Sequence, residues 1–64
     1  MLLYAKRKME ELMVDDIYFF RMAYEWCFHK DVDPTLDVAE FRLNGHMPKY
    51  VVRFVKYLQK TDLQ

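Results

Sequence analysis

Residues that bend a chain sharply are scarce in this sequence. Its 64 residues include one Gly and two Pro, all of them between residues 34 and 48. So few breaks argue against a disordered chain and against a turn-rich β domain. The sequence therefore predicts a single all-α domain, 1–64, in which three or four short helices form a small bundle.

Cysteine and long apolar runs are also scarce. Cys27 is the only cysteine, so no intrachain disulfide can form, and its apolar neighbours indicate a buried small side chain rather than a reactive thiol. No stretch approaches the roughly 18 uncharged apolar residues of a membrane span. In MLLYAKRK the apolar letters precede the basic ones, which is the reverse of a secretory signal. We therefore expect a cytoplasmic protein with no membrane segment.

Neither sign of charge prevails in the chain. Ten basic and ten acidic side chains cancel. Net charge therefore favours neither nucleic acid nor an anionic membrane as a partner. Any such role has to come from a local cluster of charge.

The segment from Ile17 to Phe28, IYFFRMAYEWCF, is by contrast apolar at ten of its twelve positions. As a helix it would be apolar nearly all round, and a chain this short has few residues left to cover it. We expect an internal stripe formed by Ile17, Phe20, Tyr24 and Phe28. On the opposite side we expect a protein interface made of Tyr18, Phe19, Met22 and Trp26. The sequence thus predicts that the fold is completed by homodimerisation through this helix.

Apolar spacing predicts helices over residues 2–14, 16–29, 34–44 and 48–60. The first two could be continuous, since the stripe of Met9 and Met13 runs on to Ile17, but the Asp15–Asp16 pair favours a break and a new N-cap. In the third helix the expected core stripe is Leu36, Ala39 and Leu43, with Val38 and Phe41 beside it. In the fourth helix the expected core face is Val51, Phe54, Val55 and Leu58.

Two motifs could suggest chemistry around residue 31. Asp31 to Thr35, DVDPT, has the letters of the DxDxT signature of haloacid-dehalogenase-type phosphotransferases, in which the first Asp is a nucleophile. Here it follows a helix instead of a buried strand, and the chain is too short for that α/β domain. A calcium loop from Asp31 would need Gly where Leu36 stands and Glu where Arg42 stands.

A transition-metal site is not indicated either. Cys27 and His29 are two residues apart and point in different directions on a helix, so they cannot converge with Asp31 and His46. We therefore expect no catalytic residue, no metal and no cofactor, and a protein that is not an enzyme.

The last predicted helix carries a basic stripe. From His46 to Lys60 there are four Lys or Arg residues and no acidic one. A short helix, a turn at Gly45 and a second helix form the outline of a helix-turn-helix, whose second helix enters the major groove. Phe41 is bulky for such a crossing, and Pro48 lengthens the turn. The predicted nucleic-acid contacts are Lys49, Arg53, Lys56 and Lys60.

The small size, the absence of a catalytic constellation and the Met- and aromatic-rich helices resemble the small accessory proteins encoded in the early regions of temperate bacteriophages. IYFFRMAYEWCF is the most distinctive part of that resemblance. It implies a role in modulating host or phage proteins during development, in the host cytoplasm. The residues themselves favour a non-catalytic regulatory or inhibitory protein that binds another protein. The alternative is a small helix-turn-helix-like DNA-binding regulator that uses the 48–60 helix.

Overall fold

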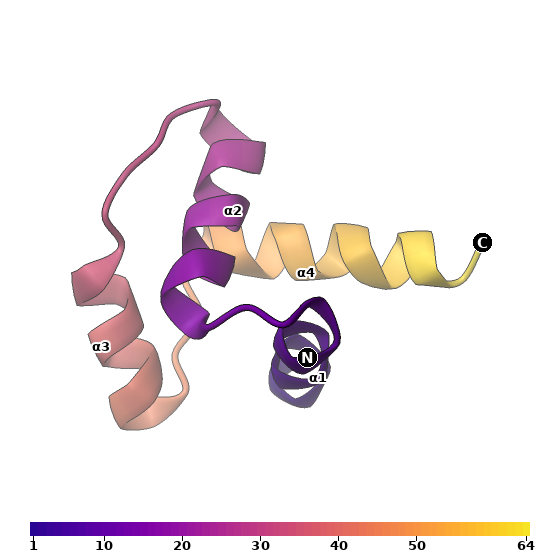
Figure 1. Cartoon of the computed structure of the whole chain (residues 1–64), viewed down its shortest axis with the longest axis horizontal. Helices are drawn as coiled ribbons and strands as arrows, with labels where there is room; N and C mark the ends of the chain where they lie inside the picture. The colour runs from indigo at the N-terminus through magenta and orange to yellow at the C-terminus, as the bar shows by residue number, and fades with distance from the viewer.

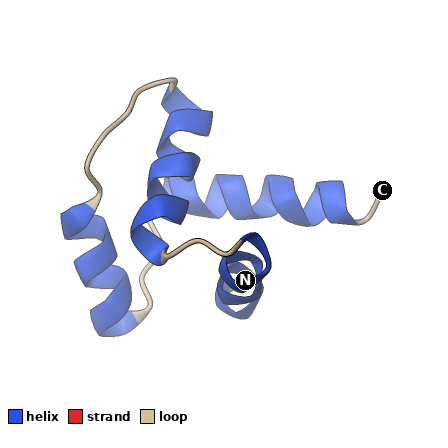
Figure 2. Ribbon diagram, viewed as in Figure 1, coloured by secondary structure: helices blue, strands red, loops and turns tan.

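A computed structural model describes all of residues 1–64, and it contains four helices and no strand (Figures 1 and 2). The helices are α1 (Leu2–Leu12), α2 (Asp16–Phe28), α3 (Thr35–Asn44) and α4 (Lys49–Asp62). In Figure 1, α2 stands across α4, α3 lies on one side of α2, and α1 is seen end-on below α4. The predicted all-α bundle is confirmed. None of its helices combines the length and the apolar character needed to cross a membrane.

The helix is interrupted between α1 and α2. Met13 adopts the left-handed conformation, with φ of 59°, and ends α1. Asp15 then caps α2, because its Oδ1 accepts a hydrogen bond from the backbone N–H of Tyr18 at 2.8 Å. An Asp side chain at this position satisfies a donor that the helix itself leaves free. The two helices are therefore separate, in agreement with the break that the paired Asp residues favour.

One hydrophobic core joins all four helices, and α2 lies at its centre. The Phe19 ring centroid is 5.4 Å from that of Phe54 on α4, and the Phe20 centroid is 5.3 Å from that of Phe41 on α3. Such tilted aromatic pairs add to the gain from burying the rings. The eleven core residues are Ala5, Met9, Phe19, Phe20, Ala23, Val38, Phe41, Tyr50, Val51, Phe54 and Val55.

The predicted internal stripe of α2 is wrong in part. Phe20 is buried, but Phe28 is exposed, and the fully buried positions include Phe19 and Ala23. The reason is that α4 packs over the Phe19 side of α2. The buried face of α2 therefore lies between the predicted internal stripe and the predicted interface. Of the predicted stripe, Ile17 and Tyr24 lie at the edge of the core.

The predicted core stripe of α3 is also wrong, because the helix turns its Val38 and Phe41 side toward the core. Val38 and Phe41 are buried, whereas Leu36 and Leu43 are each 82% exposed. Phe41 packs against the ring of Phe20. Burying this aromatic side chain removes more apolar area from water than burying a leucine would. The rotation leaves the two leucines on the outer surface.

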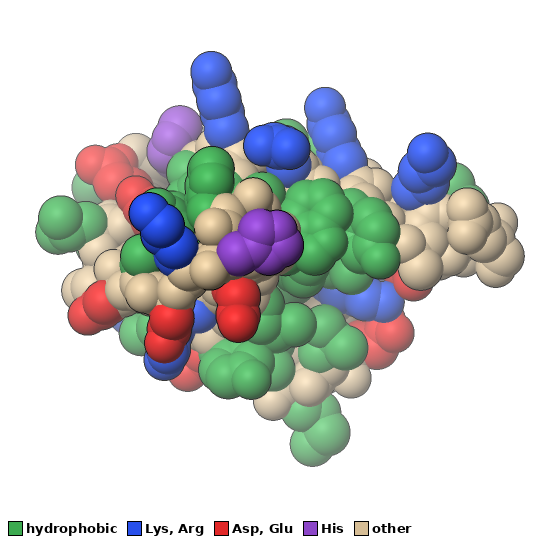
Figure 3. All heavy atoms as spheres, turned by 90° about the horizontal axis from the view of Figure 1, so that it is seen from above, with side chains coloured by type: hydrophobic (Ala, Val, Ile, Leu, Met, Phe, Trp, Pro, Cys, Tyr) green, Lys and Arg blue, Asp and Glu red, His purple; other side chains and the backbone are tan.

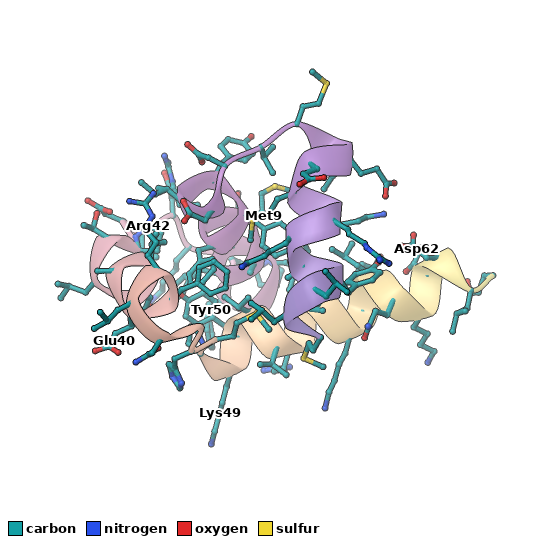
Figure 4. The ribbon with its side chains drawn as sticks, turned by 90° about the horizontal axis from the view of Figure 1, so that it is seen from below. Met9, Glu40, Arg42, Lys49, Tyr50 and Asp62 are labelled. Carbon is teal, nitrogen blue, oxygen red and sulfur yellow. The ribbon has the colours of Figure 1, made fainter.

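A polar cluster fastens α1 to the far end of α4. Lys8 Nζ is 3.1 Å from Asp62 Oδ2 and 3.1 Å from Glu11 Oε1, and the Tyr4 hydroxyl donates a hydrogen bond to Asp62. These bonds from Tyr4 and Lys8 lower the pKa of Asp62. Lys8 is the one charged side chain that is buried. The helix α4 therefore continues to Asp62, past the predicted end at residue 60, and Figure 4 shows Asp62 beside α1.

Candidate protein-contact surface

An apolar groove lies where α2 crosses α4. It has a volume of about 310 Å³ and is lined by Met22, Glu25, Trp26 and Phe54. Trp26 follows Met22 by one turn of α2, so the two side chains lie one above the other. The ring centroid of Trp26 is 5.8 Å from that of Phe54 and 4.8 Å from that of Tyr57. We call this surface the Trp26 groove, with Tyr57 at its edge.

Three of the four predicted interface residues lie at or near this groove. Tyr18 is 54% exposed, Trp26 is 40% exposed, and Met22 is half-buried. Phe19, however, is fully buried, so its assignment to the interface is wrong. It follows Tyr18 by one position, which rotates it by about 100° on the helix and turns it into the core against Phe54.

Sequence reasoning missed Tyr57, which is 46% exposed and packs against Trp26. Its signal was an aromatic residue beside the core stripe of α4, three positions after Phe54. Phe54 was assigned to the core, and it is buried there while it also lines the groove. The pairing of Trp26 with Tyr57 depends on how two distant helices cross, which spacing along the chain does not encode.

The basic residues predicted for nucleic-acid contact all lie on the outer face of α4. At 3.6 residues per turn they fall within about 60° of one another, and they extend over about 16 Å along the helix. All four are exposed, and none belongs to the four ion pairs of the structure. The residues of this basic row are Lys49, Arg53, Lys56 and Lys60.

The figures show the same arrangement. Lys and Arg side chains stand along the edge of the molecule that follows α4 in Figure 3, and Lys49 points away from the bundle in Figure 4. The acidic residue of α4, Asp62, is turned toward Lys8 on α1. The row therefore forms a positive surface that no carboxylate of the chain contacts.

The turn before this row departs little from the predicted one. The helix α3 ends at Gly45, whose φ of 74° is left-handed, and α4 begins at Lys49 after Pro48. The Tyr50 hydroxyl donates a hydrogen bond to Asp37 Oδ2 at 2.5 Å and thereby ties α4 to α3. Burial, together with this bond, raises the pKa of Tyr50. The position of α4 relative to α3 is thus held by a specific contact.

The DVDPT segment has structural roles. Asp31 pairs with Arg21, at 2.9 Å from Nη2 to Oδ1, and Asp33 accepts a hydrogen bond from the backbone N–H of Thr35 at 3.0 Å. A hollow of about 510 Å³ lies beside them, lined by Ile17, Arg21, Asp31, Val32, Asp33 and Thr35. Asp31 neutralises the guanidinium in this hollow, and Asp33, one residue before the Pro34 N-cap, accepts a hydrogen bond from the first backbone N–H of α3.

The residues considered for a metal do not converge. Cys27 is half-buried, with its Sγ 3.5 Å from the carbonyl oxygen of Tyr50, and His29 is exposed at the end of α2. No group of three or more His, Cys, Asp or Glu side chains is placed to hold a metal ion.

No protein-family model, curated protein or solved structure matches this chain. The fold therefore defines its class in structural terms, as a small all-α bundle of four helices.

Proposed function

We propose that this chain is a non-catalytic regulatory or inhibitory protein that acts by binding another protein through the Trp26 groove. The observation that carries the proposal is the pair of half-exposed rings, Trp26 and Tyr57, packed together beside Met22. Trp and Tyr are enriched among the few residues that dominate the energy of protein interfaces. The resemblance to phage accessory proteins supports a partner among the host or phage proteins that control development.

A second copy of the chain is the first partner to consider. Most soluble oligomers are homo-oligomers, and an apolar surface that is left open on a small bundle is a common site of association. The ring of Trp26 packs against those of Phe54 and Tyr57, so little of its conformational entropy is lost when a partner covers it.

The test replaces Trp26 with Ala and compares the variant with Phe28→Ala. Phe28 lies on the same helix with a similar exposure, 47%, but on the flank away from the groove. Light scattering over a range of concentrations measures self-association, and a pull-down from nuclease-treated host lysate measures binding of other proteins. We expect Trp26→Ala to weaken binding at least tenfold, or about 1.4 kcal/mol. Phe28→Ala should bind like the wild type, and equal binding by both variants would contradict the proposal.

We also propose DNA binding by α4 as a second candidate function, supported by the unpaired basic row. Each phosphate contact contributes about −0.9 to the slope of log K against log salt concentration, so four cations predict a slope of about −3.6. Titration of a fluorescent DNA duplex at several salt concentrations measures this slope. The variant Lys49→Gln should reduce its size by about one contact. A chain that does not bind duplex DNA at low salt has no such function.

A further inference from the structure

The outer face of α3 carries an apolar ridge that nothing in the chain covers. Leu36 and Leu43 lie two turns apart on this face, both largely exposed, with the exposed Ala39 between them. They stand opposite the buried Val38 and Phe41. We call these three residues the α3 ridge. A small residue between two large ones gives the ridge a profile that can enter a groove.

One edge of this ridge is acidic. Glu40 follows Ala39 and is exposed, and its carboxylate accepts a hydrogen bond only from Asn44 Nδ2, at 3.2 Å. Figure 4 shows Glu40 pointing outward from α3. Arg42, on the other edge, is already bound to Asp16 at 2.7 Å. The free charge beside the ridge is therefore negative.

One edge of the Trp26 groove has the opposite charge. Arg53 and Lys60 lie one turn before and one turn after Tyr57, on the same side of α4, and neither forms an ion pair. Glu25 lines the other wall of the groove. An acidic-edged ridge is therefore attracted in the orientation that turns its acidic side toward α4, and it is repelled in the reverse orientation.

We propose that the α3 ridge of one copy of this chain docks into the Trp26 groove of a second copy, with Glu40 facing Arg53. The proposal rests on the protein-binding function proposed above, and it names the partner. Apolar surface meets apolar surface in this contact, and the acidic edge meets the basic one. Two of the apolar surfaces that the bundle leaves open are thereby accounted for by one interaction.

The positions of the two surfaces make the contact head-to-tail. Ile17 lines the hollow at the start of α3, whereas Met22 and Trp26 lie on the other flank of α2. A single molecule therefore cannot place its own ridge in its own groove. Each contact leaves one free ridge and one free groove, so assemblies grow with concentration or close into rings.

A mixing experiment tests this geometry directly. The variant Trp26→Ala keeps the ridge and loses the groove, and the double variant Leu36→Glu/Leu43→Glu keeps the groove and loses the ridge. Light scattering should show that each variant alone is a monomer of 7.9 kDa. An equimolar mixture should form particles of two chains and no larger ones. Should Trp26→Ala unfold, Arg53→Glu replaces it, since that residue is exposed and lies outside the core.

A charge exchange tests the orientation. Arg53→Glu alone and Glu40→Lys alone should each weaken self-association at least tenfold, and the double variant should recover most of that loss. Lys49→Glu is the matched control, because it makes the same change in the same basic row at the end away from Trp26. It should associate like the wild type.

The outcomes separate this proposal from the one on which it rests. A wild-type chain that stays monomeric at millimolar concentration overturns the head-to-tail contact. Self-association that is lost in Trp26→Ala but kept in Leu36→Glu/Leu43→Glu also overturns it, because the groove then binds something other than α3. In that second case the Trp26 groove still functions as a protein-contact surface.

Discussion

Replacing Phe19 distinguishes the core of the bundle from its contact surface. Phe19 is fully buried against Phe54, while its neighbour Tyr18 is largely exposed. Removing a buried Phe ring costs about 3–5 kcal/mol, since it leaves a cavity as well as removing apolar contacts. At roughly 0.05–0.15 kcal/mol per residue, a domain of 64 residues has a total stability of about 3–10 kcal/mol. Phe19→Ala should therefore remove most of the stability, or all of it.

The comparison with Tyr18→Ala supplies the control. An exposed side chain outside the core changes stability by about 0.5 kcal/mol or less, so Tyr18→Ala should unfold near the wild-type urea midpoint. Phe19→Leu, which removes fewer carbon atoms from the core, should cost clearly less than Phe19→Ala. Urea unfolding followed by far-UV circular dichroism, at one low protein concentration, measures all three. A Phe19→Ala variant as stable as wild type, or a larger loss in Tyr18→Ala, would refute the placement of these residues.

Three further predictions concern the ends of the helices and an ion pair. Gly45→Ala should destabilise the fold by about 1–2 kcal/mol in urea unfolding, because φ at this position is 74°, and Gly45→Asn should lose less. Asp15→Ala should cost about 1 kcal/mol by the same measurement, since the N-cap bond of α2 is lost. The pH dependence of stability should reveal Asp16, whose pKa is lowered by the hydrogen bonds and charge of Arg42. That contribution is complete above the unfolded pKa of about 3.9 and is lost as the pH falls through the folded value. In acid-unfolding measurements, the free energy of unfolding should therefore decrease less below about pH 4 in Arg42→Gln than in the wild type.

The sequence predicted the core face of α4 well, because its apolar residues form one stripe. Val51, Phe54 and Val55 are buried as expected, and the basic residues lie on the opposite face. A helix with one apolar face and one charged face can be oriented without knowledge of its neighbours.

The orientations of α2 and α3 could not be predicted in the same way. The helix α3 has two apolar stripes, one with Leu36 and the other with Phe41, and contact with Phe20 on α2 decides which is buried. The helix α2 is apolar nearly all round, so the path of α4 across it decides that Phe19 is internal and Trp26 is not. The candidate groove depends on the same crossing, which is why its α2 residues were largely predicted and Tyr57 was not.

The bond between Lys8 and Asp62 has a consequence for synthesis on the ribosome. The two residues are 54 positions apart. At about 5–20 residues per second, Lys8 is made roughly 3–11 s before its carboxylate partner exists. The bond that ties α1 to α4 can therefore form only after the whole of α4 has been made.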